Sequence, residues 1–264
     1  MSSAATGRWT AAARAAEAAR PDALFDDPWA AELAGDLGRA ALAASESASG
    51  GPNPFLPVRT RWFDDVVVAS TATQMVILGA GMDARAYRLS TPKIVFELDL
   101  PETFEVKEPI LAKGRALADR RIVPVDIRAE WLATLLAAGF DPTLPTLWLA
   151  EGPFFYLPSD LVQGVLEVAA QSSAEGSEFA ADVFGSGVLE LDGMQSYITA
   201  RKQQGEPLPF SSDEPGEFFA AHGWAASCSE VGSAGANFGR LAASGNPDQF
   251  KKTMRSYLVH ARKN

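Results

Sequence analysis

Cysteine and histidine are nearly absent from this sequence. Its 264 residues include one cysteine, Cys228, and two histidines, His222 and His260. A single cysteine excludes an internal disulfide and a cysteine-rich zinc site, so we expect no metal centre and a reducing compartment such as the cytoplasm. Neither histidine lies in a motif with a partner carboxylate, which leaves few candidates for a general base.

Positive charge is also scarce. The chain has 23 Lys and Arg residues against 33 Asp and Glu residues, for a formal net charge of −10. Proteins that bind nucleic-acid phosphates need a basic face, so nucleic acid is not an expected partner. No stretch approaches the roughly 20 apolar residues of a membrane-spanning helix, and we expect no membrane partner either.

Short apolar runs alternate with helix-like segments through much of the chain. Helical patterns occupy residues 1–73, and strands and helices alternate over 74–183. Buried strands without polar alternation, separated by helices, are typical of a parallel, doubly wound α/β sheet. The predicted strands are Met75–Gly79, Ile94–Asp99, Arg121–Ile127, Thr146–Glu151 and Glu178–Val183.

The pattern changes in the last third of the chain. Residues 184–224 are polar and punctuated by glycine and proline, which predicts an insertion over the carboxyl edge of the sheet. Residues 225–264 hold two β-like runs, separated by a loop and a short helical stretch. Because this connection is not a helical crossover, the two runs are expected to form an antiparallel pair that finishes the sheet. We therefore expect one domain over residues 1–264.

The stretch QMVILGAGMDARAYRL, Gln74–Leu89, indicates a strand, a tight turn and a helix. Gly79, Gly81 and Ala84 fit the G-x-G-x-x-A pattern, in which missing side chains let the backbone approach a nucleotide-like ligand. Asp99 ends the next predicted strand 20 residues after Gly79. At this spacing a carboxylate accepts hydrogen bonds from a ribose. These features suit either NAD(H) or S-adenosylmethionine.

Acidic residues near the turn favour one of these cofactors. Asp83 would lie beside a pyrophosphate at the helix N-terminus, where a negative charge is unfavourable. S-adenosylmethionine has no phosphate, and its cationic groups tolerate carboxylates. Asp126 and Ile127 end the third predicted strand, where they suit an adenine. Glu151 and Gly152 end the fourth, at the crevice where such sheets bind ligands. The sequence therefore favours S-adenosylmethionine.

Several motifs, in chain order, also resemble a known family. They are RTRWFDD, the glycine-turn stretch, VFELDLPE with Lys107, VPVDIR followed by Trp131, LWLAEGPFFYLP, and the pair Gly223-Trp224. Together they resemble the leucine carboxyl methyltransferase superfamily, in particular its bacterial branch of tetracenomycin-type polyketide O-methyltransferases. The resemblance covers nearly the whole chain. It implies a Rossmann-like S-adenosylmethionine methyltransferase fold with a mostly parallel seven-stranded sheet, an N-terminal helical extension and a helical lid after the fifth strand.

The resemblance also implies roles for individual residues. Arg61 matches the arginine that pairs with the methionyl carboxylate of the cofactor, and Arg59 and Arg14 are expected to share that task. Glu151 is expected under the methionyl end. The complete cofactor-binding set that we predict is Arg14, Arg59, Arg61, Gly79, Ala80, Gly81, Asp99, Leu100, Asp126, Ile127, Glu151 and Gly152.

Some of these residues have a purely structural alternative. Arg59 and Arg61 flank Asp64 and Asp65, so ion pairs on a helix surface are an alternative to ligand binding. Lys107 is expected to be a solvated residue of a helix rather than part of the site.

The expected reaction is methyl transfer to an oxygen. An alcohol or phenol benefits from a general base, for which the candidates are Tyr156, Tyr197 and His222, whereas a carboxylate is already ionised at pH 7. The scarcity of bases favours O-methylation of a carboxylate, or otherwise a hydroxyl, on a small polyketide-like or aromatic metabolite. A protein C-terminal carboxyl methyltransferase, an NAD-dependent oxidoreductase and a non-enzymatic S-adenosylmethionine-binding module are the alternatives.

Overall fold

The computed structural model describes residues 3–90, 94–191, 194–241 and 255–264. The chain divides into two compact units, Met1–Phe140 and Asp141–Asn264. Each unit contains its own strands and helices. The expectation of a single domain, with segments 1–73, 74–183, 184–224 and 225–264, stays a prediction.

The first unit begins with three helices and continues with alternating strands and helices. β1 pairs in parallel with β2, and β2 in parallel with β3, so the strand order in this unit is β3-β2-β1. Every residue of β1 is buried, as expected for a strand covered on both faces. The elements are α1 (Ser3–Ala18), α2 (Ala30–Ser49), α3 (Phe55–Ala69), β1 (Gln74–Leu78), α4 (Arg85–Arg88), β2 (Ile94–Asp99), α5 (Pro101–Leu111), β3 (Asp119–Pro124) and α6 (Leu132–Ala137).

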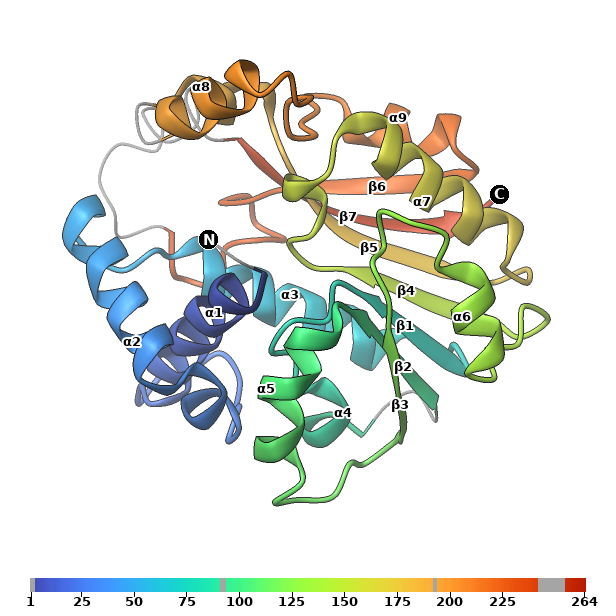
Figure 1. Cartoon of the computed structure of the whole chain (residues 1–264), viewed down its shortest axis with the longest axis horizontal. Helices are drawn as coiled ribbons and strands as arrows, with labels where there is room; N and C mark the ends of the chain where they lie inside the picture. The colour runs from blue at the N-terminus through green and yellow to red at the C-terminus, as the bar shows by residue number, and fades with distance from the viewer. Residues whose placement is uncertain (1–2, 91–93, 192–193, 242–254) are drawn as a thin grey trace. The chain divides into compact units, whose positions relative to one another are not determined.

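Small residues let α1 and α2, the blue helices in Figure 1, pack closely. Ala11 and Ala12 of α1 are buried in one apolar cluster with Leu33 and Ala34 of α2. The same cluster includes Met82, which follows the glycine turn. The N-terminal helices therefore share an apolar core with the residues just after that turn.

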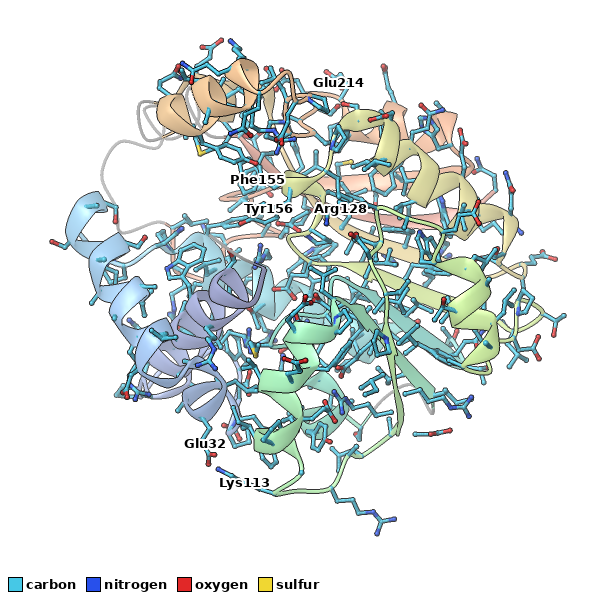
Figure 2. All side chains as sticks on the ribbon, viewed as in Figure 1. Glu32, Lys113, Arg128, Phe155, Tyr156 and Glu214 are labelled. Carbon is cyan, nitrogen blue, oxygen red and sulfur yellow. The ribbon has the colours of Figure 1, made fainter. Side chains whose placement is uncertain are left out.

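An ion pair on the surface joins α2 to the residues after α5. Glu32 of α2 lies beside Lys113, as Figure 2 shows. Because both side chains are exposed, this pair contributes little to stability.

The second unit combines parallel and antiparallel pairing. β4 pairs in parallel with β5, whereas β7 is antiparallel to both β5 and β6, giving the order β4-β5-β7-β6. The predicted antiparallel pair near the C-terminus is thereby confirmed. The elements are β4 (Thr146–Ala150), η1 (Phe154–Tyr156), α7 (Ser159–Gln171), β5 (Glu178–Phe184), η2 (Ser186–Glu190), α8 (Gln195–Gln203), α9 (Pro215–Ala221), β6 (Trp224–Glu230) and β7 (Ser256–Lys263).

The end of β3 differs from the sequence prediction. β3 ends at Pro124 instead of residue 127, because its partner strand β2 ends at Asp99, opposite Pro124. Asp126 and Ile127 therefore lie in the loop after the strand. The short helical stretch expected between the last two strands falls on residues 242–254, outside the described residues. Within the described part of the chain, no helix combines the length and apolar character needed to cross a membrane.

Candidate functional site

The glycine turn follows β1 directly and is held by the end of β2. Gly79 and Gly81 have φ angles of 65° and 45°, in the left-handed region that residues with a Cβ rarely adopt. The N–H of Ala80 donates to the carbonyl of Leu98 at 2.9 Å. The N–H of Gly81 donates to Oδ2 of Asp99 at 2.6 Å. The structure thus brings the predicted turn together with the predicted ribose-binding carboxylate.

Asp99 is buried and also anchors the start of α5. Its Oδ1 accepts the N–H of Leu100 at 2.7 Å and the hydroxyl of Thr103 at 2.9 Å. Sequence reasoning missed Thr103. The i,i+4 rule for helices gave no signal for this contact, because Asp99 belongs to β2 and Thr103 to α5.

The helix after the glycine turn, α4, is a single turn and adds little macrodipole. The side chain of Asp83 is only 9% exposed there, and it accepts the backbone N–H of Arg85 at 2.6 Å while pairing with its guanidinium. Burial by itself would raise the pKa of Asp83, but the charges of Arg85, Lys107 and Arg88, together with that N–H, hold the pKa well below its usual range. The carboxylate of Asp83 is therefore neutralised within the protein.

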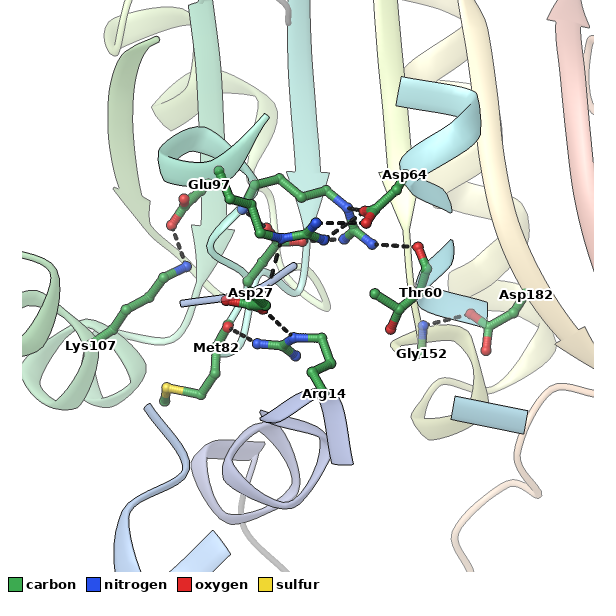
Figure 3. Close-up of polar contacts among 12 residues, drawn as sticks. Arg14, Asp27, Thr60, Asp64, Met82, Glu97, Lys107, Gly152 and Asp182 are labelled. Carbon is green, nitrogen blue, oxygen red and sulfur yellow. Dashed lines mark hydrogen bonds and ion pairs between the residues drawn. The ribbon is translucent and has the colours of Figure 1, made fainter. Parts of the chain in front are cut away.

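The helix α1 lies against the glycine turn. A Cβ placed on Gly7 would stand 3.5 Å from Cα of Gly81 and 3.3 Å from the backbone nitrogen of Met82. Arg14, two turns further along α1, donates to the carbonyl of Met82 at 2.6 Å and to Asp27 at 2.8 Å, as Figure 3 shows. In this structure Arg14 therefore fastens α1 to the residue after the turn. Its contact with the methionyl carboxylate stays a prediction.

A buried carboxylate of α3 holds both arginines of α4. Asp64 accepts Nε of Arg85 at 2.8 Å and two guanidinium nitrogens of Arg88 at 2.6 Å each (Figure 3). The carboxylate of Asp64 thus pairs with two guanidinium groups, and this pairing offsets much of the free-energy cost of burying the charges.

The two arginines predicted from RTRWFDD have different surroundings. The side chain of Arg61 is 39% exposed and donates to Asp65 at 2.8 Å and to the carbonyl of Leu24 at 2.9 Å, so the helix-surface ion pair is present. Arg59 is buried, with its guanidinium carbon 5.4 Å from the centre of the Phe55 ring. For both residues, binding of a ligand carboxylate stays a prediction.

The predicted adenine pair lies in the loop after β3. Asp126 accepts the guanidinium of Arg128 at 2.6 Å and its backbone N–H at 2.9 Å. The side-chain hydrogen bond from Arg128 is the main cause that lowers the pKa of Asp126, partly opposed by burial. Ile127, the other member of the pair, is half-buried between these two charged residues.

A second glycine turn in the other unit repeats the arrangement of the first. Gly152, which follows Glu151 after β4, has a φ angle of 89° and donates its N–H to Oδ1 of Asp182 at 2.6 Å. As with Gly81 and Asp99, the glycine after one strand is held by a carboxylate from the neighbouring strand. Sequence reasoning missed Asp182, although a charged residue among the buried positions of the strand EFAADVF is a signal of such a role.

Two of the three candidate bases are tyrosines. Tyr156 is 49% exposed in η1, and its ring lies edge-on to that of Phe155 (Figure 2). The hydroxyl oxygen of Tyr197 in α8 accepts a guanidinium N–H of Arg201 at 3.2 Å.

The third candidate base, His222, and Glu151 lie at opposite ends of the strands in the second unit. His222 immediately precedes Gly223 and β6, which begins beside the end of β7, and that end of β7 pairs with the beginning of β5. Glu151 instead follows the carboxyl end of β4, beside the end of β5. β5 spans seven residues, so these two ends stand roughly 20 Å apart. In addition, Nδ1 of His222 is 2.6 Å from the carbonyl of Phe218. The structure does not bring His222 near Glu151.

The expectation that Lys107 is solvated is wrong. Lys107 is 0% exposed, and its ammonium lies 2.6 Å from Glu97. Arg120 also pairs with Glu97, at 2.8 Å, and with Glu108 at 2.6 Å. Burial alone would lower the pKa of Arg120, but hydrogen bonds and charges of these two carboxylates raise it. The charges along α5 alone did not predict that Lys107 is buried, because its partner Glu97 comes from β2.

The residues around the first glycine turn fit an adenosine-bearing cofactor. Left-handed glycines and the absence of Cβ atoms leave the backbone approachable, and Asp99 supplies a buried acceptor beside it. Among the residues that the structure describes, no group of three or more His, Cys, Asp or Glu side chains is arranged to hold a metal ion.

Solved structures share this fold. A DUF574 family protein from Streptomyces avermitilis has a TM-score of 0.62 at 17% identity, over 87% of this chain and 91% of that one. A geranyl diphosphate methyltransferase in complex with SAM has a TM-score of 0.54 at 10% identity, over 87% and 93%. These likenesses confirm the expected α/β methyltransferase fold with its mostly parallel seven-stranded sheet. The fold is therefore that of an S-adenosylmethionine-dependent methyltransferase.

Sequence comparison identifies the family. The model of the leucine carboxyl methyltransferase family matches residues 8–170. A protein of Rhodococcus jostii is 39% identical over 231 residues, 80% of this chain and 79% of its own length. One of Streptomyces coelicolor is 35% identical over 264 residues, 89% and 88% of the two chains. Both are assigned as S-adenosyl-L-methionine-dependent methyltransferases. The chain belongs to the leucine carboxyl methyltransferase family, and this decides against the NAD-dependent oxidoreductase.

Proposed function

We propose that this methyltransferase acts on an oxygen of a small polyketide-like or aromatic metabolite, as the resemblance to the tetracenomycin-type branch suggests. The preferred acceptor is a carboxylate, with a hydroxyl as the second choice. The position of the two histidines supports this preference. His222 lies at the amino end of β5, and His260 pairs with Ala180 inside the ladder. Neither stands at the carboxyl end of β4 or β5, where a base for an alcohol would be needed.

The proposed roles of the residues follow the resemblance, and the contacts around the first glycine turn support them. S-adenosylmethionine, when bound, supplies a methyl group activated by a sulfonium. The backbone at Gly79 and Gly81 takes the adenosine side of the cofactor, with Asp99 accepting from the ribose. Asp126 and Ile127 take the adenine, and Arg14, Arg59 and Arg61 take the methionyl carboxylate. Glu151 and Gly152 form part of the methionyl side.

Transfer to a carboxylate needs no proton acceptor. The acceptor oxygen forms a bond to the methyl carbon while the carbon–sulfur bond breaks, and no proton has to leave. The protein then has to align the two partners and exclude water, and alignment of this kind supplies on the order of 7–11 kcal/mol. An alcohol or phenol would also need a proton acceptor, for which Tyr156 and Tyr197 are the remaining candidates.

Titration with S-adenosylhomocysteine tests the cofactor site. We expect the wild type to bind and Asp99→Ala to bind at least about tenfold more weakly, because a hydrogen bond to a buried charge is lost. Arg61→Ala tests the methionyl contact in the same way. Asp119→Ala, an exposed aspartate of β3, is the matched control and should bind like the wild type. Equal affinity of the wild type and Asp99→Ala would refute the proposed site.

A panel of acceptors tests the type of oxygen. The enzyme is incubated with methyl-labelled S-adenosylmethionine and aromatic carboxylic acids, phenols, or a peptide that ends in leucine. Mild alkali releases methanol from a methyl ester and leaves a methyl ether intact. Alkali-labile label on the small acids supports the proposal. Stable label on phenols would indicate a hydroxyl acceptor, and label on the peptide would indicate a protein C-terminal carboxyl methyltransferase.

A further inference from the structure

One face of α5 binds the two carboxylates of β2. Thr103 and Lys107, one helical turn apart, contact Asp99 and Glu97, which are two residues apart on the strand. Thr103 is only 1% exposed, and its hydroxyl donates to Oδ1 of Asp99 at 2.9 Å. The helix therefore reaches Asp99 through a buried hydroxyl.

The hydrogen bonds of Asp99 use most of its capacity. A carboxylate offers about four acceptor positions, two on each oxygen. Oδ1 accepts the N–H of Leu100 and the hydroxyl of Thr103, so both of its positions are used. Oδ2 accepts the N–H of Gly81. Within the described part of the chain, this leaves about one acceptor position, on the oxygen that faces the glycine turn.

We infer that Thr103 is a positioning residue that restricts Asp99 to a single ribose hydroxyl. The inference rests on the proposed role of Asp99 in cofactor binding. The hydroxyl of Thr103 and the N–H of Leu100 occupy Oδ1 and hold the carboxylate in one rotamer, with Oδ2 beside Gly81. The ribose diol then meets one open acceptor, so only one of its two hydroxyls donates to Asp99.

Deoxy analogues of the product test this directly in the wild type. We expect that, of 2′-deoxy- and 3′-deoxy-S-adenosylhomocysteine, one binds at least about tenfold more weakly than the parent, because its bond to a buried charge is lost. The other should bind within about twofold of the parent. Equal weakening by both analogues would mean that both hydroxyls bind Asp99, which overturns the inference. This measurement needs no variant and so does not depend on the folding of a mutant.

Substitution of Thr103 tests the positioning step. Thr103→Val keeps the side-chain shape but removes the donor, which opens a position on Oδ1. We expect affinity for S-adenosylhomocysteine to fall about threefold to tenfold, as for loss of one hydrogen bond, and the difference between the two deoxy analogues to shrink. Thr103→Ser retains the hydroxyl and should show the wild-type affinity for S-adenosylhomocysteine and the wild-type difference between the two analogues. If Thr103→Val keeps the full wild-type discrimination, Thr103 does not position Asp99.

A matched control separates positioning from stability. Thr146 is also fully buried, and its hydroxyl donates to the carbonyl of Leu144 at 3.0 Å. Thr146→Val should lower the melting temperature as Thr103→Val does but leave discrimination between the analogues unchanged. If the wild type fails to bind S-adenosylhomocysteine at all, both this inference and the proposed cofactor site are wrong. Binding of the parent together with equal weakening by both analogues refutes the inference alone.

Discussion

Gly38 of α2 lies directly against the backbone of Arg8 in α1. A Cβ on Gly38 would stand 2.3 Å from the carbonyl oxygen of Arg8 and 2.8 Å from its carbonyl carbon. Both are backbone atoms, so relief requires a shift of one helix against the other. Because α1 also packs on Gly81 through Gly7, the spacing of these two helices bears on the proposed cofactor site.

Two glycine-to-alanine changes should therefore have opposite effects. Gly38→Ala forces the two helices apart and should lower the free energy of unfolding by about 1–3 kcal/mol. Gly164, in α7, has nothing within 4 Å of an added Cβ apart from its own helix and chain neighbours. Gly164→Ala should raise the free energy of unfolding by about 0.5–1 kcal/mol through helix propensity. Urea unfolding followed by circular dichroism measures both, and effects of the same sign would contradict the prediction.

Acid should reveal the buried charge of Asp83. Its pKa is lowered in the folded state, so the unfolded chain binds its proton more readily. The stabilising contribution is complete above the ordinary aspartate pKa, near about 4, and is lost as the pH falls from there toward the lower folded-state value. Asp83→Asn should lower the free energy of unfolding at pH 7 by about 3 kcal/mol, since Arg85 loses a buried partner.

The difference in free energy of unfolding between the wild type and Asp83→Asn should become smaller as the pH falls from 7 to about 3. Urea unfolding at several pH values measures it. Asp36→Asn, at an exposed position of α2, is the control and should show a small difference at every pH. If the free energies of unfolding of the wild type and Asp83→Asn differ by the same amount at every pH, the carboxylate charge is not the cause of the lost stability.

The buried cluster around Glu97 should be asymmetric toward mutation. Glu97→Gln leaves two buried cations, Lys107 and Arg120, without their shared carboxylate and should cost about 3–5 kcal/mol of stability. Lys107→Met leaves Glu97 paired with Arg120 and should cost less. The double variant should recover part of the loss caused by Glu97→Gln. Chemical denaturation measures all three, and a larger loss from Lys107→Met would overturn this order.

His222 should be dispensable for catalysis. Loss of a general base typically costs about 100-fold to 10,000-fold in rate, so the distinction is easily measured. His222→Phe keeps a ring next to Phe218, and we expect methyl-transfer rates within about twofold of the wild type and an unchanged pH profile. The rate is followed with the acceptor that the panel identifies. A loss of 100-fold at unchanged melting temperature would restore His222 as a base.

Local chemistry accounts for the parts of the site that could be predicted from sequence. Gly79 and Gly81 adopt left-handed φ angles that depend on the residues themselves, and Asp99 comes at the spacing set by one strand–turn–helix–strand unit. The main strands were likewise predictable because their apolar runs are buried. The end of β3 was misjudged by three residues, since the apolar pattern continues through Val125 while the partner strand β2 already ends at Asp99, opposite Pro124.

Contacts between residues of different helices and strands could not be predicted from the sequence. Thr103 and Asp182 act through carboxylate bonds to positions that lie close only after strands pair and α5 packs. Lys107 has the charge pattern of a surface helix residue, yet it is buried against its partner Glu97 of β2.

The sequence by itself determined the family, the methyl donor and the place of the first glycine turn, because these depend on residue types at short, fixed spacings. Tertiary structure alone decided which charges are buried in pairs, which residue orients Asp99, and that His222 lies at the amino end of β5. The physical reason is register. Because β7 pairs antiparallel with β5, the direction of the last strands sets the end of the sheet at which His222 lies. The residues next to His222 in the sequence do not predict that direction.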